Sequence, residues 1–264
     1  METKRKIRRN AKYWRDRAIQ EEAGVDKLST ATSKRMADLY RRSYRRLESE
    51  INALYAEILD KGIENMSRTD LYNLNHYTQL RDAVAKEVRG LASAQDEALS
   101  SLLEHIAINT YESNMEALGL EFSLMSEIQA KAIATENWSG TSFSSRIWKN
   151  AEGFNMRVMD DVESLVIGGK MPADVKKQLM EDYTVSWNEA DRLVRTESSR
   201  AFNKSAKDSY TTAGIEQCEY LAESDCCDIC REFKGRKLPI AEFPELPMHP
   251  NCRCTIAPIV EGFI

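Results

Sequence analysis

The prolines of this chain divide it into two unequal parts. The first 171 residues contain no proline, whereas five of the six prolines lie in the last 26 residues. Proline breaks the interior of a helix because it lacks the backbone N–H and clashes with the preceding turn. The sequence therefore permits long helices in most of the chain and excludes them from its C-terminal end.

All six cysteines lie on the same side of this division, within the last 47 residues. We therefore predict an α+β fold that is predominantly α-helical, with a small cysteine-rich module after a helical body. The expected domains are a helical body with a basic N-terminal arm, residues 1–143, and a second domain, residues 144–264. The cysteine and histidine module occupies about residues 215–260 of the second domain.

The composition excludes several classes of protein. With 264 residues and 42% hydrophobic side chains, the chain is large and apolar enough to form real cores rather than remain disordered. It has no stretch of the roughly 18–20 uncharged apolar residues that a membrane helix needs, so no membrane partner is expected. The start, Met1 to Arg17, is basic and lacks an apolar segment, so a secretory signal is not expected.

Hydrophobic spacing and turn residues predict the individual elements. Between Met36 and Ile58, apolar residues recur every three or four positions, which places them on one face of a helix. Ser67 is expected to cap the next helix together with Asp70, and Gly214 to end the last one. The remaining predicted elements are helices over 93–119, 121–137, 144–167, 172–182 and 186–213, and strands over 215–222 and 255–260.

Basic residues are concentrated near the N-terminus, where residues 1–50 carry 15 Lys+Arg against 8 Asp+Glu. Such side chains can bind nucleic-acid phosphates without reading sequence, dock onto an acidic protein surface, or simply form a solvated helix face. The candidate contact residues are Lys4, Arg5, Lys6, Arg8 and Arg9 in the arm, and Arg41, Arg42, Arg45 and Arg46 on one helical face.

The cysteine module has the spacing of a metal site. Cys227 and Cys230 form a C-x-x-C knuckle, whose two thiolates can face one tetrahedral ion. His249, Cys252 and Cys254 follow about nineteen residues later and could complete a structural zinc site with three cysteines and one histidine. The same side chains could instead form disulfides, a redox pair or plain buried thiols.

The order of these residues argues against an enzyme. A zinc deaminase has H-x-E before P-C-x-x-C, whereas here the histidine comes last and no Glu lies two residues after His249. The module also lacks the second histidine that an HNH-type nuclease would use. Upstream of the module, Arg195 and Glu197 lie two apart on a predicted helix and do not face each other. Each is expected to pair elsewhere, with Asp225 or the module, or to lie on a solvated face.

Several of these residues recur in a fixed order that resembles a known family. They are Arg195-Thr196-Glu197, Ala201, Asn203, Tyr210, Gly214, Asp225, Cys227, Cys230, Gly235 and the run HPNCRC at 249–254. Over about residues 150–260, the chain resembles the C-terminal domain of phage Mu protein F-like minor head proteins, also called head morphogenesis proteins. Cys226 departs from the family pattern, in which Cys227 has the three-residue step to Cys230.

This resemblance implies a minor head protein of a tailed phage or prophage. Such a protein associates with the portal and assists procapsid assembly and genome packaging or delivery, with no catalytic residues to carry over. The implied partners are the portal protein, the scaffolding and major capsid proteins, and double-stranded DNA. The implied location is the host cytoplasm during assembly and then the virion.

The resemblance also suggests roles for single residues. Cys227, Cys230, His249, Cys252 and Cys254 correspond to positions that hold the fold or a metal. Arg195, Glu197 and Asp225 are expected to structure the domain. Two other functions remain open at this stage. One is a zinc-containing protein that binds nucleic acid without sequence preference, and the other is an enzyme or toxin-like module.

Overall fold

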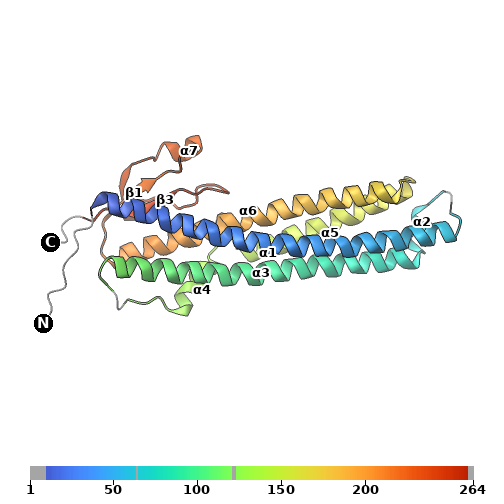
Figure 1. The fold of residues 1–264 in the computed structure, drawn as a ribbon, viewed down its shortest axis with the longest axis horizontal. Coiled ribbons are helices and arrows are strands. Elements are labelled where there is room, and N and C mark those ends of the chain that lie inside the picture. The colour runs from blue at the N-terminus through green and yellow to red at the C-terminus, as the bar shows by residue number, and fades with distance from the viewer. Residues whose placement is uncertain (1–9, 64, 121–122, 261–264) are drawn as a thin grey trace. The chain divides into compact units, whose positions relative to one another are not determined.

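The computed structural model describes residues 10–63, 65–120 and 123–260 and confirms the predominantly helical α+β class (Figure 1). The helices are α1 Ala11–Asp60, α2 Arg68–Tyr72, α3 Asn75–Ala117, α4 Glu127–Thr135, α5 Phe143–Ile167, α6 Pro172–Thr212 and α7 Asp228–Arg231, with a 3-10 turn at Ile240–Glu242. The strands are β1 Gln217–Leu221, β2 Lys237–Pro239 and β3 Thr255–Pro258. No helix in the described ranges is long and apolar enough to cross a membrane.

The chain forms two compact units that are interleaved along the sequence. The first comprises residues 1–32, 99–136 and 192–264, and the second comprises residues 33–98 and 137–191. The long helices α1, α3 and α6 each contribute one part to each unit. The sequence analysis instead placed one boundary between residues 143 and 144.

The second unit is built around an apolar core of helices. Its parts of α1, α3, α5 and α6 lie side by side (Figure 1). The stripe predicted from Met36 to Ile58 supplies the α1 share of this core, since Leu47, Ile51 and Leu54 are fully buried. Ser67 and Asp70 form the predicted capping box, although the helix that they begin, α2, has only five residues.

Two predicted helix boundaries in this unit were wrong. The helix expected to start at residue 93 is part of α3, which begins at Asn75. There the carboxylate of Glu57 accepts the backbone N–H groups of Asn75 and His76, which gives α3 a cap from another helix.

The predicted helices 172–182 and 186–213 are likewise one helix, α6. The β-branched residues Thr184 and Val185 favoured a break at this point. Tertiary packing overrides that preference, because Tyr183 is 4% exposed, lies edge-on to Phe154 and has its hydroxyl 2.6 Å from that of Ser43.

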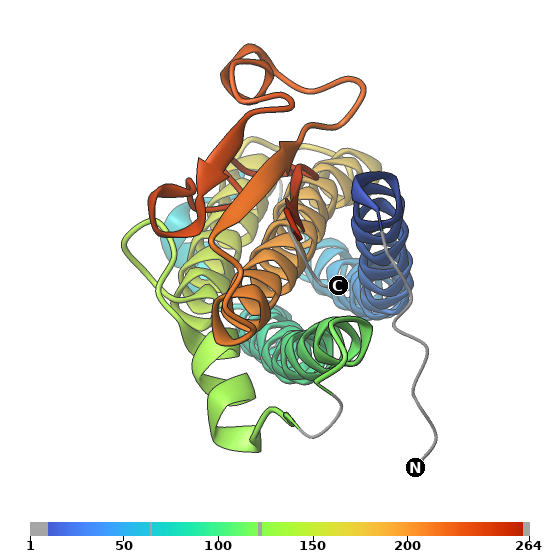
Figure 2. The same cartoon turned by 90° about the vertical axis from the view of Figure 1, so that its left-hand side faces the viewer.

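The first unit combines parts of α1, α3 and α6 with α4 and a small sheet. The sheet is antiparallel in the order β2-β1-β3, with Glu219 of the central strand opposite Lys237 and Ala257. Figure 2 shows the strands next to α6 and the short helix α7 farther out from it. Tyr210 of α6 shares a core with residues of β1 and β3 there.

The strands predicted at 215–222 and 255–260 are confirmed as β1 and β3, but β2 was missed. It has three residues and includes Pro239, which is tolerated because β2 is an edge strand. The helix predicted over 121–137 is shorter than expected. It is α4, which begins after a capping box between Ser126 and Gln129.

Candidate metal centre and the helix that supports it

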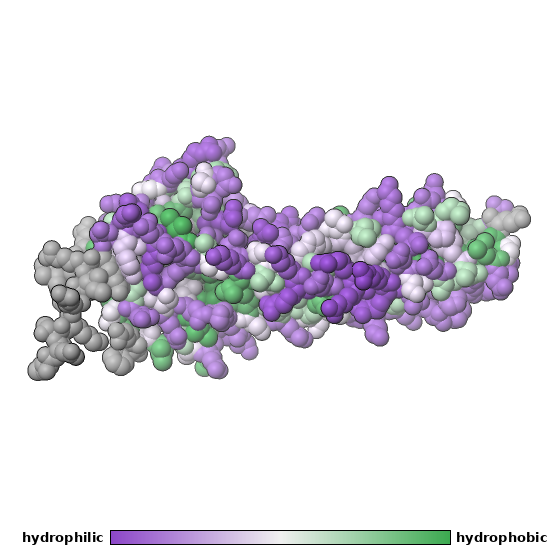
Figure 3. Space-filling model, in the orientation of Figure 1, coloured by the Kyte–Doolittle hydropathy of each residue, from purple (hydrophilic) through white to green (hydrophobic). Residues whose placement is uncertain are grey.

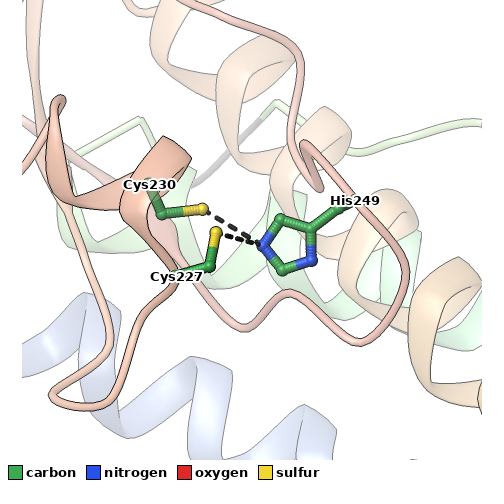
Figure 4. Close-up of side chains that lie close together, drawn as sticks. All are labelled: Cys227, Cys230 and His249. Atoms are coloured by element: carbon green, nitrogen blue, oxygen red, sulfur yellow. Dashed lines mark hydrogen bonds between the residues drawn. The ribbon is translucent and has the colours of Figure 1, made fainter.

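Two cysteines approach His249 from one short helix. Cys227 is the N-cap of α7 and Cys230 lies within it, so the two thiols project to one side of a single turn (Figure 4). Cys227 Sγ lies 3.1 Å and Cys230 Sγ 3.3 Å from His249 Nε2. The other ring nitrogen, Nδ1, lies 2.9 Å from the backbone oxygen of Pro250. An N–H at Nδ1 would donate to that oxygen and leave Nε2 free as a metal ligand.

Two further thiols extend this cluster into the core. Cys252 Sγ lies 3.6 Å from Cys230 Sγ, and Cys230, Cys252 and Cys254 form a second set whose sulfur atoms all lie within 4.8 Å of one another. The two sets share Cys230. All six cysteines are free thiols, and neither Cys218 nor Cys226 belongs to either set.

Three donor–donor distances in this cluster are close to those around a tetrahedral zinc ion. With Zn–S bonds of about 2.3 Å and Zn–N bonds of about 2.1 Å, ligand atoms around one zinc lie roughly 3.5–3.8 Å apart. The separations of 3.1, 3.3 and 3.6 Å are close to that range. Cys227, Cys230 and His249 could therefore hold a metal ion, and Cys230, Cys252 and Cys254 form a second possible set, from which a fourth ligand could come by a small shift.

The thiols have different proton affinities in the absence of a metal. Burial raises the pKa of Cys230 to about 11. The hydrogen bond that Cys252 donates to Cys254 lowers the pKa of Cys254 to about 5 and raises that of Cys252. The Cys218 thiol, which lies apart on β1, has a pKa raised to about 12 by burial. A metal would replace these shared protons, since it binds thiolates.

Helix α6, which carries the Arg195-Thr196-Glu197 motif, forms hydrogen bonds with the HPNCRC loop (residues 249–254) at two points. Thr196 Oγ1 accepts the backbone N–H of Asn251 at 3.1 Å. Two turns further along α6, Asn203 Nδ2 donates to the backbone oxygen of Cys254 at 3.2 Å. Positions seven apart lie on nearly the same face of a helix, so Thr196 and Asn203 together fix both ends of the loop segment that carries Cys252.

Glu197 has a partner on its own helix. It is fully buried and accepts a hydrogen bond at 2.6 Å from Arg200, which is also buried. Arg200 was missed by the sequence analysis, although its position three residues after Glu197 was a usable signal.

Arg195 and Asp225 have separate surroundings. Arg195 is exposed and lines a cavity together with Asn251 and Arg253 of the loop, so it does lie beside the module. Asp225 is exposed in the turn that precedes α7. The domain-structuring roles of Arg195, Glu197 and Asp225 stay predictions.

The predicted basic contact residues fall into two groups. Lys4, Arg5, Lys6, Arg8 and Arg9 lie outside the described residues. Arg41, Arg42, Arg45 and Arg46 are exposed on α1, and the surface over the middle of α1 is strongly hydrophilic (Figure 3). Arg41 pairs with Asp38 at 2.9 Å and Arg46 with Glu87 at 2.6 Å, so part of this basic face is already neutralised.

Comparison with known families agrees with the motif order. Residues 156–257 match the model of the family described as phage Mu protein F like protein. The resemblance inferred from the motifs is thereby confirmed over these residues, which include α6 and the cluster of Cys227, Cys230, His249, Cys252 and Cys254. The match points to a protein of phage head morphogenesis and to the virion as its location. No significant match was found among curated proteins or solved structures.

Proposed function

We propose that this protein is a minor head protein of a tailed phage or prophage that associates with the portal. The observation that carries this proposal is the family match over residues 156–257. The matched region contains the Arg195-Thr196-Glu197 motif of α6 and the cysteine and histidine residues from Cys227 to Cys254. In this proposal the protein assists procapsid assembly and genome packaging or delivery, first in the host cytoplasm and then in the virion. The scaffolding protein, the major capsid protein and double-stranded DNA are the further partners proposed.

The protein acts by structure in this proposal and not as an enzyme. The cysteine cluster binds one structural zinc ion through Cys227, Cys230, His249 and Cys252. Cys252 is preferred to Cys254 because its sulfur is 3.6 Å from that of Cys230, which is near the edge of a zinc tetrahedron. The ion would link α7 to the HPNCRC loop, two segments with few apolar residues of their own to hold them together.

The test is capture of the portal. The tagged protein is co-expressed with the portal protein of the same phage or prophage, purified, and analysed by native mass spectrometry. A complex of defined stoichiometry is expected. A chain that never retains the portal would overturn the proposal.

Charge-reversed variants locate the contact. In Arg42→Glu with Arg45→Glu, two exposed cations of the α1 face are reversed, and Lys170→Glu with Lys177→Glu reverses two exposed cations elsewhere in the same unit. Loss of portal capture in the first variant alone would assign the contact to the α1 face.

Sequence-independent DNA binding is the second candidate, favoured by the exposed arginines Arg42 and Arg45. Binding driven by phosphate contacts weakens steeply between 50 and 200 mM salt because counterions are released. A gel-shift series on duplexes of unrelated sequence measures this. DNA binding that is salt-sensitive and lost in the arginine variant, without portal capture, would favour this second function.

A further inference from the structure

A cavity of about 190 Å³ lies within the first unit, next to the HPNCRC loop. Its walls come from α1, from the motif segment of α6, and from residues 251–253 of the loop. An apolar protein cavity of about 150 Å³ holds a benzene molecule, so this one has room for a group of roughly that size. Val25 of α1 and Phe202 of α6 supply apolar wall, while most of the other lining residues are polar or charged.

The cavity is lined by two carboxylates, Glu22 and Asp26, and by two arginines, Arg195 and Arg253. Arg253 lies 3.9 Å from Asp26, and Arg195 also has an interaction partner, so both cations are engaged. Glu22, one turn before Asp26 on α1, has no hydrogen bond or ion pair with any described residue.

The surroundings of Glu22 make this carboxylate unusual. Burial and the neighbouring carboxylates of Glu223 and Asp26 raise its pKa to about 7, against a smaller opposing effect of Arg253. The Cys254 thiol raises this pKa as well. A partly buried carboxylate among like charges is stabilised by a cation placed next to it.

A second unpartnered group lines the same cavity. Ser198 of α6 is 1% exposed, and its hydroxyl has no hydrogen-bond partner. A buried hydroxyl usually has at least one partner, and it can accept a hydrogen bond from an N–H. The cavity thus offers a carboxylate, a hydroxyl acceptor and apolar walls to one small group.

We propose that this cavity binds an organic cation, an ammonium or guanidinium group, with Glu22 as its counter-ion and Ser198 as a hydrogen-bond acceptor. Val25 and Phe202 would pack against the carbon atoms of the same group. The group belongs either to a free small cation or to a basic side chain of a partner protein. The proposal is independent of portal binding, since it rests on the cavity alone.

The test is titration calorimetry at pH 8, where Glu22 is ionised. The probes are ethylguanidinium, putrescine and the capped peptide Ac-Gly-Arg-Gly-NH2, titrated into the full chain. At least one is expected to bind wild type, and Glu22→Gln to weaken that binding at least tenfold. Asp16→Asn, an exposed carboxylate on the same helix, is the matched control and should bind as wild type does. Removing a repelled charge should not unfold the chain, and Ser198→Ala provides a second variant that should weaken binding.

The outcomes of this titration distinguish a free small cation from a partner side chain, and they show which results would overturn the proposal. Binding of the free cations alone would assign the site to a small molecule, whereas binding of the peptide alone would assign it to a partner side chain. No binding of any probe at millimolar concentration, or equal binding by Glu22→Gln, would overturn the proposal. So would binding of inorganic phosphate that is lost in Arg195→Ala, since the site would then take an anion.

Discussion

Arg200 and Glu197 form a buried ion pair on α6 that also holds another helix. Arg200 Nε donates to Glu197 Oε2 at 2.6 Å, while Nη1 and Nη2 donate to the backbone oxygens of Ile133 and Ala134 at 2.8 and 2.9 Å. Those oxygens belong to the last turn of α4, where carbonyl groups lack partners within the helix. One guanidinium therefore neutralises a buried carboxylate and caps α4.

We expect Arg200→Ala to lower the free energy of unfolding by about 3–5 kcal/mol, because it removes the buried guanidinium 2.6 Å from the fully buried Glu197 carboxylate. Urea unfolding monitored by circular dichroism measures this. Arg192→Ala, which removes an exposed arginine two turns earlier on the same helix, should change stability by no more than about 0.5 kcal/mol. Replacing both Glu197 and Arg200 by methionine should cost less than Arg200→Ala alone. An equal or larger cost would mean that loss of the guanidinium beside the buried carboxylate is not the cause.

Two threonines of α6 test whether the helix fixes the HPNCRC loop. Thr196 and Thr211 each donate to the carbonyl four residues earlier, but only Thr196 also accepts a loop N–H, that of Asn251. Thr196→Val should therefore speed hydrogen exchange at the amide of Asn251 about five- to tenfold, for the loss of about 1 kcal/mol of hydrogen bond. Thr211→Val should leave that amide unchanged, and equal exchange in both variants would argue that the loop is held by other contacts.

A structural zinc ion makes a sharp prediction for neighbouring cysteines. Metal analysis of the purified chain should give one zinc ion per molecule. Cys227→Ser should reduce zinc affinity at least about tenfold, because loss of a residue that only hydrogen-bonds to a metal ligand already costs about that much. Cys226→Ser changes the adjacent thiol, which belongs to neither donor set, and should retain the ion. Removal of zinc by a chelator should expose amides in residues 215–258 to exchange while those of α5 stay protected.

Cobalt substitution separates the two candidates for the fourth ligand. Sulfur-to-cobalt charge-transfer absorption is expected to weaken in Cys252→Ser and to persist in Cys254→Ser. The reverse pattern would make Cys254 the ligand, and full zinc binding by Cys227→Ser would exclude the proposed donor set.

Local sequence signals correctly predicted where some helices begin and end. The capping box at Ser67 and the end of α6 before Gly214, which has a positive φ of 75°, are dictated by residues within a few positions of each other. It was harder to predict that two expected helices are one. Helix α6 continues through Tyr183 and Val185 because Tyr183 packs against residues far away in the sequence. β2 was missed because three residues, one of them proline, carry no period.

The candidate site shows the same division. The spacing of Cys227 and Cys230 already indicated that both thiols face one point, and the distances to His249 agree with it. The hydrogen bond between Thr196 and Asn251 joins residues 55 positions apart, so no local sequence pattern predicts it. The cavity around Glu22 could not be predicted either, since its lining residues on α1 and α6 lie more than 160 positions apart in the sequence.

The raised pKa of Glu22 predicts how stability changes with pH. Its pKa is about 7 in the folded chain, against an ordinary value of 4.5, so the folded state binds this proton more tightly than the unfolded state does. The resulting stabilisation is complete below pH 4.5 and is lost as pH rises through 7. For one partly exposed group the slope should stay below about 1.4 kcal/mol per pH unit.

Urea midpoints of wild type, Glu22→Gln and the exposed control Asp16→Asn, compared from pH 5 to 8, measure this pH dependence. Glu22→Gln should flatten the pH dependence and be more stable than wild type above pH 7, whereas Asp16→Asn should follow wild type. Parallel curves for all three chains would show that Glu22 ionises as an ordinary surface carboxylate, and that the cavity does not press it toward the neutral form.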